Sequence, residues 1–159
     1  MIKPGIPDDR EVISDDLYRE IILDHYRSPR HRGRLESANV RAEGKNPLCG
    51  DELSLALEVS KDRGVIEGVG IEGKGCAISQ ASGSMMAEAL PGRTVDEAAG
   101  FARAFKRVML EGAEADSLPP ELEDLKSLEN VKQYPVRIKC AILAWNTLLE
   151  AIKERTSHA

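Results

Sequence analysis

The sequence has few aromatic residues and no long hydrophobic run. Aromatic residues make up 4% of the 159 residues, so a buried core must be mainly aliphatic. The longest apolar run, Cys140 to Trp145, has six residues, whereas a membrane-spanning helix needs about 20. The N-terminal segment is charged and has neither the apolar stretch nor the cleavage site of a secretory signal. We therefore expect no membrane association and a cytoplasmic location.

The chain also lacks a concentrated excess of positive charge. Its 22 Lys and Arg residues are outnumbered by 27 Asp and Glu residues, and the formal net charge is −5. Phosphate binding needs a dense basic surface, so nucleic acid is not an expected partner. One basic cluster spans residues 27–34. It is either a solvated loop or a docking surface for an acidic protein partner.

Cysteine is scarce and odd in number, with Cys49, Cys76 and Cys140. Three cysteines cannot all pair within one chain. In a reducing compartment, thiols serve in metal binding or as reactive groups, or are simply buried. A chain of this length suits one compact domain with a sizeable core. The role of the three thiols is therefore the main functional question.

The N-terminal half predicts one helix followed by strands. We expect residues 1–13 to form a flexible lead-in, followed by an amphipathic helix over 15–28 that Ser14 caps. Alternating apolar residues around a central turn sequence predict an antiparallel hairpin over 52–72. An earlier strand at 40–46 is weakly indicated.

The C-terminal half predicts helices. Helical spacing begins at Ser79, and Thr94 with Glu97 forms a reciprocal capping pair for the next helix. Pro120 and Pro135 suit the first turns of a short helix and of a long final helix. Strands followed by helices predict an α+β domain, with helices packed on one face of a small antiparallel sheet.

Each cysteine lies at the junction of a predicted element and a loop. Cys49 precedes the first hairpin strand, Cys76 follows the second, and Cys140 lies in the first turns of the final helix. The hairpin brings the start of one strand beside the end of the other, so Cys49, Asp51 and Cys76 should be neighbours. Cys140 completes the group if the final helix starts over that corner. Three thiolates and one carboxylate suit tetrahedral zinc or an iron site.

A structural role for the cysteines stays open on these residues alone. Free cysteine is commonly buried, and Cys140 fits that interpretation best because it lies on the apolar face of a helix. Cys49 fits it poorly, since a Cys-Gly-Asp loop is a poor place to bury a thiol. The chain has no pair of CxxC motifs, so spacing favours neither a metal site nor an inert core.

Two other motifs carry less weight. Asp24 and His25 could form an acid–base pair, but we favour a helix-face histidine satisfied by packing or capping. The segment 68–73 matches GxGxxG formally. It lies within a hairpin strand and not between a parallel strand and its helix, so we do not expect dinucleotide binding.

Four ordered segments resemble the U-type iron-sulfur cluster assembly proteins. They read LYREIILDHYRSPR over 17–30, NPLCGD over 46–51, GCAISQAS over 75–82 and VRIKCAILAW over 136–145. The similarity extends from about residue 15 to about residue 152. The resemblance implies one site that binds zinc or a nascent iron-sulfur cluster, formed by Cys49, Asp51, Cys76 and Cys140.

Two departures from the scaffold branch, IscU, favour the SufU branch of this family. IscU has a histidine immediately before its last cysteine, where this chain has Lys139, which cannot ligate a metal while protonated. IscU also has Leu-Pro-Pro-Val-Lys where this chain has Gln-Tyr-Pro-Val-Arg over 133–137. The Arg-Ile-Lys-Cys sequence and a helical insert at about 94–130 are similar to SufU. We expect a single domain over 14–155 that carries this insert.

The resemblance implies a zinc-bound sulfur acceptor that serves a SufS-like cysteine desulfurase. Cys49 would carry persulfide sulfur, as in a zinc-dependent sulfurtransferase, while Asp51, Cys76 and Cys140 keep the metal in place. Arg137 would steady the anionic site or contact the partner, although an arginine near a helix start is commonly a solvated charge.

Two alternatives to the sulfur acceptor stay open. One is a non-enzymatic scaffold that assembles a transient 2Fe-2S cluster, or binds iron, on the same ligands and donates the cluster to acceptor proteins. The other is a zinc-stabilised interaction domain without sulfur chemistry. All three hypotheses use the same metal ligands, so the ligand set does not separate them.

Overall fold

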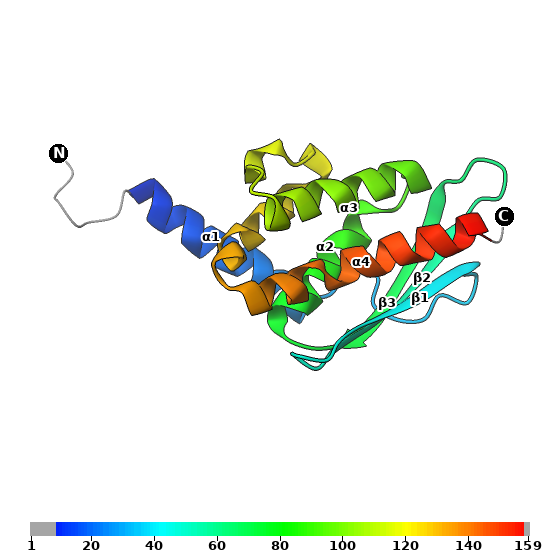
Figure 1. Cartoon of the computed structure of the whole chain (residues 1–159), viewed down its shortest axis with the longest axis horizontal. Coiled ribbons are helices and arrows are strands. Elements are labelled where there is room, and N and C mark those ends of the chain that lie inside the picture. Colours follow the sequence, from blue (N-terminus) through cyan, green and yellow to red (C-terminus); the bar gives the residue numbers. More distant parts are fainter. Residues whose placement is uncertain (1–8, 158–159) are drawn as a thin grey trace.

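A three-stranded antiparallel sheet forms one side of the molecule in a computed structural model, which describes residues 9–157 (Figure 1). The strands are β1 (Val40–Asn46), β2 (Asp51–Val59) and β3 (Ile66–Lys74), in the spatial order β1-β2-β3. The β2–β3 pairing confirms the predicted hairpin. The weakly indicated strand β1 pairs with β2 along its whole length, ending with Asn46 opposite Asp51.

The helices cover one face of this sheet. Helices α2 (Ala77–Ala89) and α4 (Pro135–Ser157) pack against the strands, and α3 (Val95–Leu110) lies on the other side of α4 (Figure 1). Two 3-10 segments, η1 (Ala115–Ser117) and η2 (Pro120–Gln133), connect α3 to α4, and η2 also contacts α1 (Asp9–Arg27). The arrangement confirms the predicted α+β class.

Aliphatic side chains fill the space between the sheet and the helices. Leu55, Leu57 and Ile66 from the strands are at most 1% exposed. The buried aromatic rings of Phe105 and Trp145 lie 5.8 Å apart between centroids and join α3 to α4. Within residues 9–157, no helix is long and apolar enough to cross a membrane.

The predicted capping pair at the start of α3 is present. Thr94 Oγ1 accepts the Glu97 N–H at 3.1 Å, and Glu97 Oε1 accepts the Thr94 N–H at 3.1 Å. Two backbone N–H groups that the helix itself leaves unpaired are thereby satisfied. Pro120 and Pro135 likewise begin η2 and α4, as their fixed φ angles predict.

Two helix starts differ from the predictions. Helix α1 begins at Asp9 and not at residue 15, so Ser14 lies inside the helix instead of capping it. A serine is compatible with either position, and the sequence alone does not distinguish them. The predicted lead-in over 1–13 therefore overlaps α1, and its remainder lies outside the described residues. Helix α2 begins before Ser79 because Cys76 caps it.

Candidate metal centre

Three of the four predicted ligands meet where the sheet approaches the start of α4. Cys49 lies in the turn between β1 and β2, Asp51 opens β2, and Cys140 lies in the second turn of α4. The sulfur atoms of Cys49 and Cys140 and one carboxylate oxygen of Asp51 lie within 4.8 Å of one another. Zinc–ligand distances are about 2.0–2.3 Å, so one ion can bind three atoms that lie this close.

A tight turn presents Cys49 at this corner. The Cys49 N–H donates to the Asn46 carbonyl at 3.2 Å. Gly50, between the predicted ligands Cys49 and Asp51, has φ 69°, which favours glycine because it lacks a Cβ atom. Cys49 is half-buried and follows Leu48, which is 70% exposed. The turn thus exposes the segment around Cys49 to solvent.

Cys76 reaches the same corner from the junction of β3 and α2. Its N–H donates to Asp51 Oδ1 at 3.0 Å, and its sulfur accepts the Ser79 N–H at 3.5 Å as the N-cap of α2. A Cβ atom at Gly75 would collide with the Asp51 carboxylate, so this close approach requires glycine. The Cys76 sulfur lies outside the compact three-ligand group, beside it.

The Asp51 carboxylate has one satisfied and one unsatisfied oxygen. Asp51 is 1% exposed, and its Oδ1 is held by the Cys76 N–H. Among the described residues, Oδ2 is the buried side-chain oxygen without a hydrogen-bond partner of ordinary geometry. An unsatisfied buried oxygen is costly, and a metal ion would satisfy it. The mixed thiol and carboxylate donors around this oxygen fit a zinc site.

Cys140 is both a core residue and a member of the site. Its side chain is fully buried, and Asn46 Nδ2 donates to its sulfur at 3.7 Å. Burial raises the pKa of the Cys140 thiol, and the neighbouring Asp51, Cys49 and Cys76 raise it further. Without a metal ion, Cys140 is therefore a neutral thiol at neutral pH.

Arg137 lies one turn before Cys140 on the exposed side of α4. The sulfurs of Cys76 and Cys140 beside its guanidinium raise the pKa of Arg137. A pocket next to these groups extends from Cys76 and Arg137 to Tyr134 on η2's C-terminal side and to Ile22 on α1. The site thus carries a permanent positive charge at its edge.

The sequence did not indicate two supporting contacts of this site. The Asn46 amide contacts a sulfur 94 residues away, and Cys76 acts as a helix cap although serine, threonine, aspartate and asparagine are the usual caps. Asn46 lies in the Asn-Pro-Leu-Cys segment, which was a signal that the residue is near the site but not of what it contacts.

Known proteins resemble the chain in sequence and in fold. The family model described as the NifU-like N terminal domain matches residues 17–158. Over 138 residues the chain is 38% identical to the zinc-dependent sulfurtransferase SufU of Bacillus subtilis, which covers 87% of this chain and 90% of that protein. Over 138 residues it is 42% identical to the iron-sulfur cluster assembly scaffold protein IscU of Thermotoga maritima, covering 87% and 94%. The crystal structure of an N-terminal NifU-like protein from Brucella abortus matches with a TM-score of 0.82 at 28% identity, covering 91% and 98%.

Proposed function

We propose, from the premise that this chain belongs to the NifU-like N-terminal domain family, that it is a zinc-bound sulfur acceptor in iron-sulfur cluster assembly. The observation that carries the proposal is the group of Cys49, Asp51 and Cys140 around a buried, unsatisfied carboxylate oxygen. The proposed partners are a SufS-like cysteine desulfurase and the cluster assembly proteins that receive the sulfur. The proposed location is the cytoplasm, where free thiols persist.

Four residues would hold the metal. Cys49, Asp51 and Cys140 supply the compact group, and Cys76, which is hydrogen-bonded to Asp51 through its backbone, is the proposed fourth ligand. Bound zinc would keep its cysteine ligands as thiolates at neutral pH. The proposed ligands lie in the β1–β2 turn, at the start of β2, at the β3–α2 junction and in the second turn of α4.

Cys49 is the proposed sulfur carrier because, of the two half-buried cysteines, it is the one whose sulfur does not cap a helix. Cys140 is fully buried, and the sulfur of Cys76 caps α2. The Cys49 thiolate would attack the outer sulfur of the desulfurase persulfide. A new S–S bond forms on Cys49, the S–S bond of the partner breaks, and the partner's cysteine leaves as a thiolate.

Arg137 would support this transfer electrostatically. Its guanidinium lies beside two site sulfurs, and it stays protonated because arginine does not lose its proton in this pH range. A fixed positive charge stabilises the negative charge that moves from the attacking sulfur to the leaving sulfur.

The test of the proposed carrier is Cys49→Ser, which replaces the thiol with a hydroxyl of similar shape. We expect ~100-fold slower sulfur uptake or none, because a hydroxyl is a poor nucleophile without a base. The measurement is the mass of tryptic peptides after incubation with the desulfurase and cysteine. In the wild type the added sulfur should lie on the peptide containing Cys49. Sulfur uptake by the variant at the wild-type rate would show that Cys49 is not the acceptor.

The similarity to IscU favours the alternative that the chain is a cluster scaffold. Anaerobic cluster reconstitution distinguishes a scaffold from a sulfur acceptor. Lys139 is exposed and offers no extra ligand next to Cys140, which supports a sulfur acceptor over a cluster scaffold. We expect the zinc-loaded protein to accelerate desulfurase turnover at once. A stable 2Fe-2S cluster that forms on the protein and transfers intact to an acceptor would instead identify a scaffold.

A further inference from the structure

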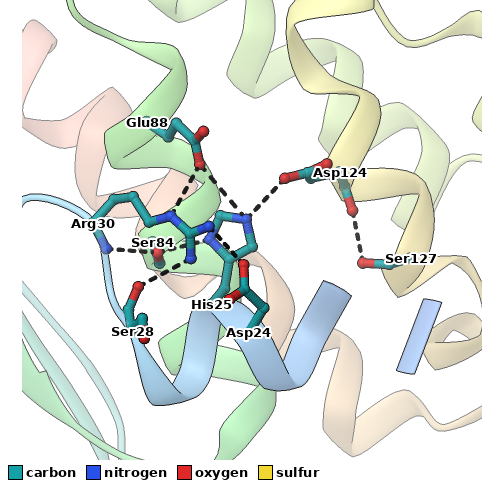
Figure 2. Close-up of polar contacts among 8 residues, drawn as sticks. All are labelled: Asp24, His25, Ser28, Arg30, Ser84, Glu88, Asp124 and Ser127. Carbon is teal, nitrogen blue, oxygen red and sulfur yellow. Dashed lines mark hydrogen bonds and ion pairs between the residues drawn. The ribbon is translucent and has the colours of Figure 1, made fainter. Parts of the chain in front are cut away.

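A second group of metal-ligating side chains lies where α1, α2 and η2 meet (Figure 2). It consists of His25, Glu88 and Asp124, whose ligand atoms lie within 4.8 Å of one another. Glu88 follows Cys76 by twelve residues along α2, which is about 18 Å at 1.5 Å per residue. We propose that this group binds a divalent transition-metal ion through one imidazole and two carboxylates. This site goes beyond the sulfur-acceptor function and does not depend on it.

The spacing of the three ligand atoms is close to what one ion requires. His25 Nε2 lies 2.8 Å from Asp124 Oδ2 and 3.6 Å from Glu88 Oε2. Nitrogen and oxygen ligands about 2.0–2.2 Å from a metal lie roughly 3.0–3.5 Å apart in tetrahedral or octahedral geometry. The ion would lie between Nε2 and the two carboxylate oxygens, in place of the hydrogen bond between Nε2 and Asp124.

The other side of the imidazole is held in the way that metal-binding histidines are. His25 is 1% exposed, and its Nδ1 lies 2.7 Å from Ser84 Oγ, which also accepts the Arg30 N–H at 2.9 Å. When Nδ1 donates to Ser84, the lone pair of Nε2 faces the two carboxylates. A histidine ligand commonly donates its second ring N–H to an oxygen, which sets the tautomer and the ring orientation.

The net charge around His25 is negative enough to balance a divalent cation. Glu88 and Asp124 contact the ring. Arg30 lies beside them and pairs with a third carboxylate, with Nη2 2.6 Å from Asp24 Oδ2 and Nε 3.4 Å from Glu88 Oε2 (Figure 2). Three negative charges and one positive charge leave two negative charges next to a neutral imidazole. Glu88 and Asp124 are 52% and 47% exposed, so water can reach the remaining coordination positions.

The ligand chemistry narrows the class of metal ion. Imidazole with carboxylates suits manganese, iron, cobalt or zinc as divalent ions, and it contains none of the thiolates that copper(I) prefers. Because the three ligands come from α1, α2 and η2, the bound ion would also link η2 to the two helices.

The test uses Mn²⁺ on protein whose cysteine site is filled with zinc. Mn²⁺ competes poorly for thiolates, so it reports on nitrogen and oxygen ligands. Titration followed by the electron paramagnetic resonance signal of free Mn²⁺ should show one bound ion per chain. Glu88→Gln and Asp124→Asn should each raise the Kd about 10-fold or more. The matched control is Glu123→Gln, which neutralises the exposed neighbour of Asp124 outside the group and should keep the wild-type Kd.

A second measurement reports on the histidine itself without replacing a buried residue. Bound Mn²⁺ should show the ¹⁴N coupling of an imidazole ligand in electron spin echo modulation, and the coupling should persist in a His31→Gln/His158→Gln variant. Absence of Mn²⁺ binding at millimolar concentration, unchanged Kd values in the two carboxylate variants, or binding without ¹⁴N coupling would each overturn the proposal. The group would then be a hydrogen-bonded clamp only.

Discussion

Arg137 lies at the edge of the cysteine site, with its guanidinium beside the sulfurs of Cys76 and Cys140. We predict that Arg137→Gln slows sulfur transfer about 10-fold, less than the 10²–10³ seen on removing a buried donor, because Arg137 is exposed. The zinc content should not change. Single-turnover persulfide formation with the desulfurase measures the effect.

The matched control for Arg137 is Lys139→Gln. Lys139 is also exposed on α4, two residues away. Its replacement by glutamine removes one positive charge, as Arg137→Gln does. An equal slowing in both variants would mean that the positive charge of α4 acts on docking in general and that Arg137 has no specific role beside the sulfurs.

Cys140 links the site to the pH dependence of stability in metal-free protein. Burial raises its pKa in the folded state above the value of an unfolded thiol, near 8.5. The stabilisation from this neutral, buried thiol is complete below the unfolded pKa and is lost as pH rises through the folded pKa. Metal-free protein should therefore lose ~1.4 kcal/mol of unfolding free energy per pH unit above about pH 8.5 from this group.

The measurement is urea unfolding of chelator-treated protein between neutral pH and pH 10, compared with Cys140→Ala. The variant is expected to be less stable at every pH, because the substitution leaves a cavity. Its unfolding free energy should nevertheless lack the decrease with pH that comes from Cys140. Identical slopes in the two proteins would show that Cys140 ionises in the folded state as it does in the unfolded state.

At the scale of single elements, α3 depends on its reciprocal capping pair. Thr94→Ala removes the acceptor of the Glu97 N–H and should lower the unfolding free energy by about 1 kcal/mol. Chemical unfolding measures this loss. Thr94→Ser is the matched control, since it keeps the hydroxyl and should retain most of the stability. A serine variant as unstable as the alanine variant would assign the effect to the lost methyl group and not to the cap.

At the scale of the whole molecule, the cysteine site joins the sheet to the helices. Its residues come from the β1–β2 turn, the start of β2, the β3–α2 junction and α4, so a metal bound only to the folded chain stabilises all of these contacts together. At free zinc 100-fold above the Kd, the stabilisation is about 2.7 kcal/mol. Removing zinc should lower the Tm by roughly 5–10 °C for a chain of this size.

Thermal unfolding before and after chelation, with zinc restored, tests this prediction. Asp51→Asn should reduce the Tm shift, because it weakens one of the proposed ligands. Glu52→Gln, the exposed next residue, should not. A Tm that does not change with zinc would show that the metal does not stabilise the domain.

Local patterns in the sequence were sufficient for most of the elements. Period-two alternation predicted β2 and β3, helical spacing predicted the helices, and Thr94 with Glu97 located the start of α3 to the residue. These features depend on residues within a few positions of one another, where backbone geometry relates spacing directly to structure. The predicted start of α1 was wrong because a serine suits both a helix cap and a helix interior.

The motifs of the sequence predicted the cysteine set, but contacts between distant segments required the tertiary structure. The contact of the Asn46 amide with the Cys140 sulfur and that of His25 with Asp124, 99 residues away, have no local pattern. Such contacts follow from how the sheet, α1, α2 and η2 pack in three dimensions. Packing depends on the side chains of all these elements at once, so residue spacing along the chain does not encode these contacts.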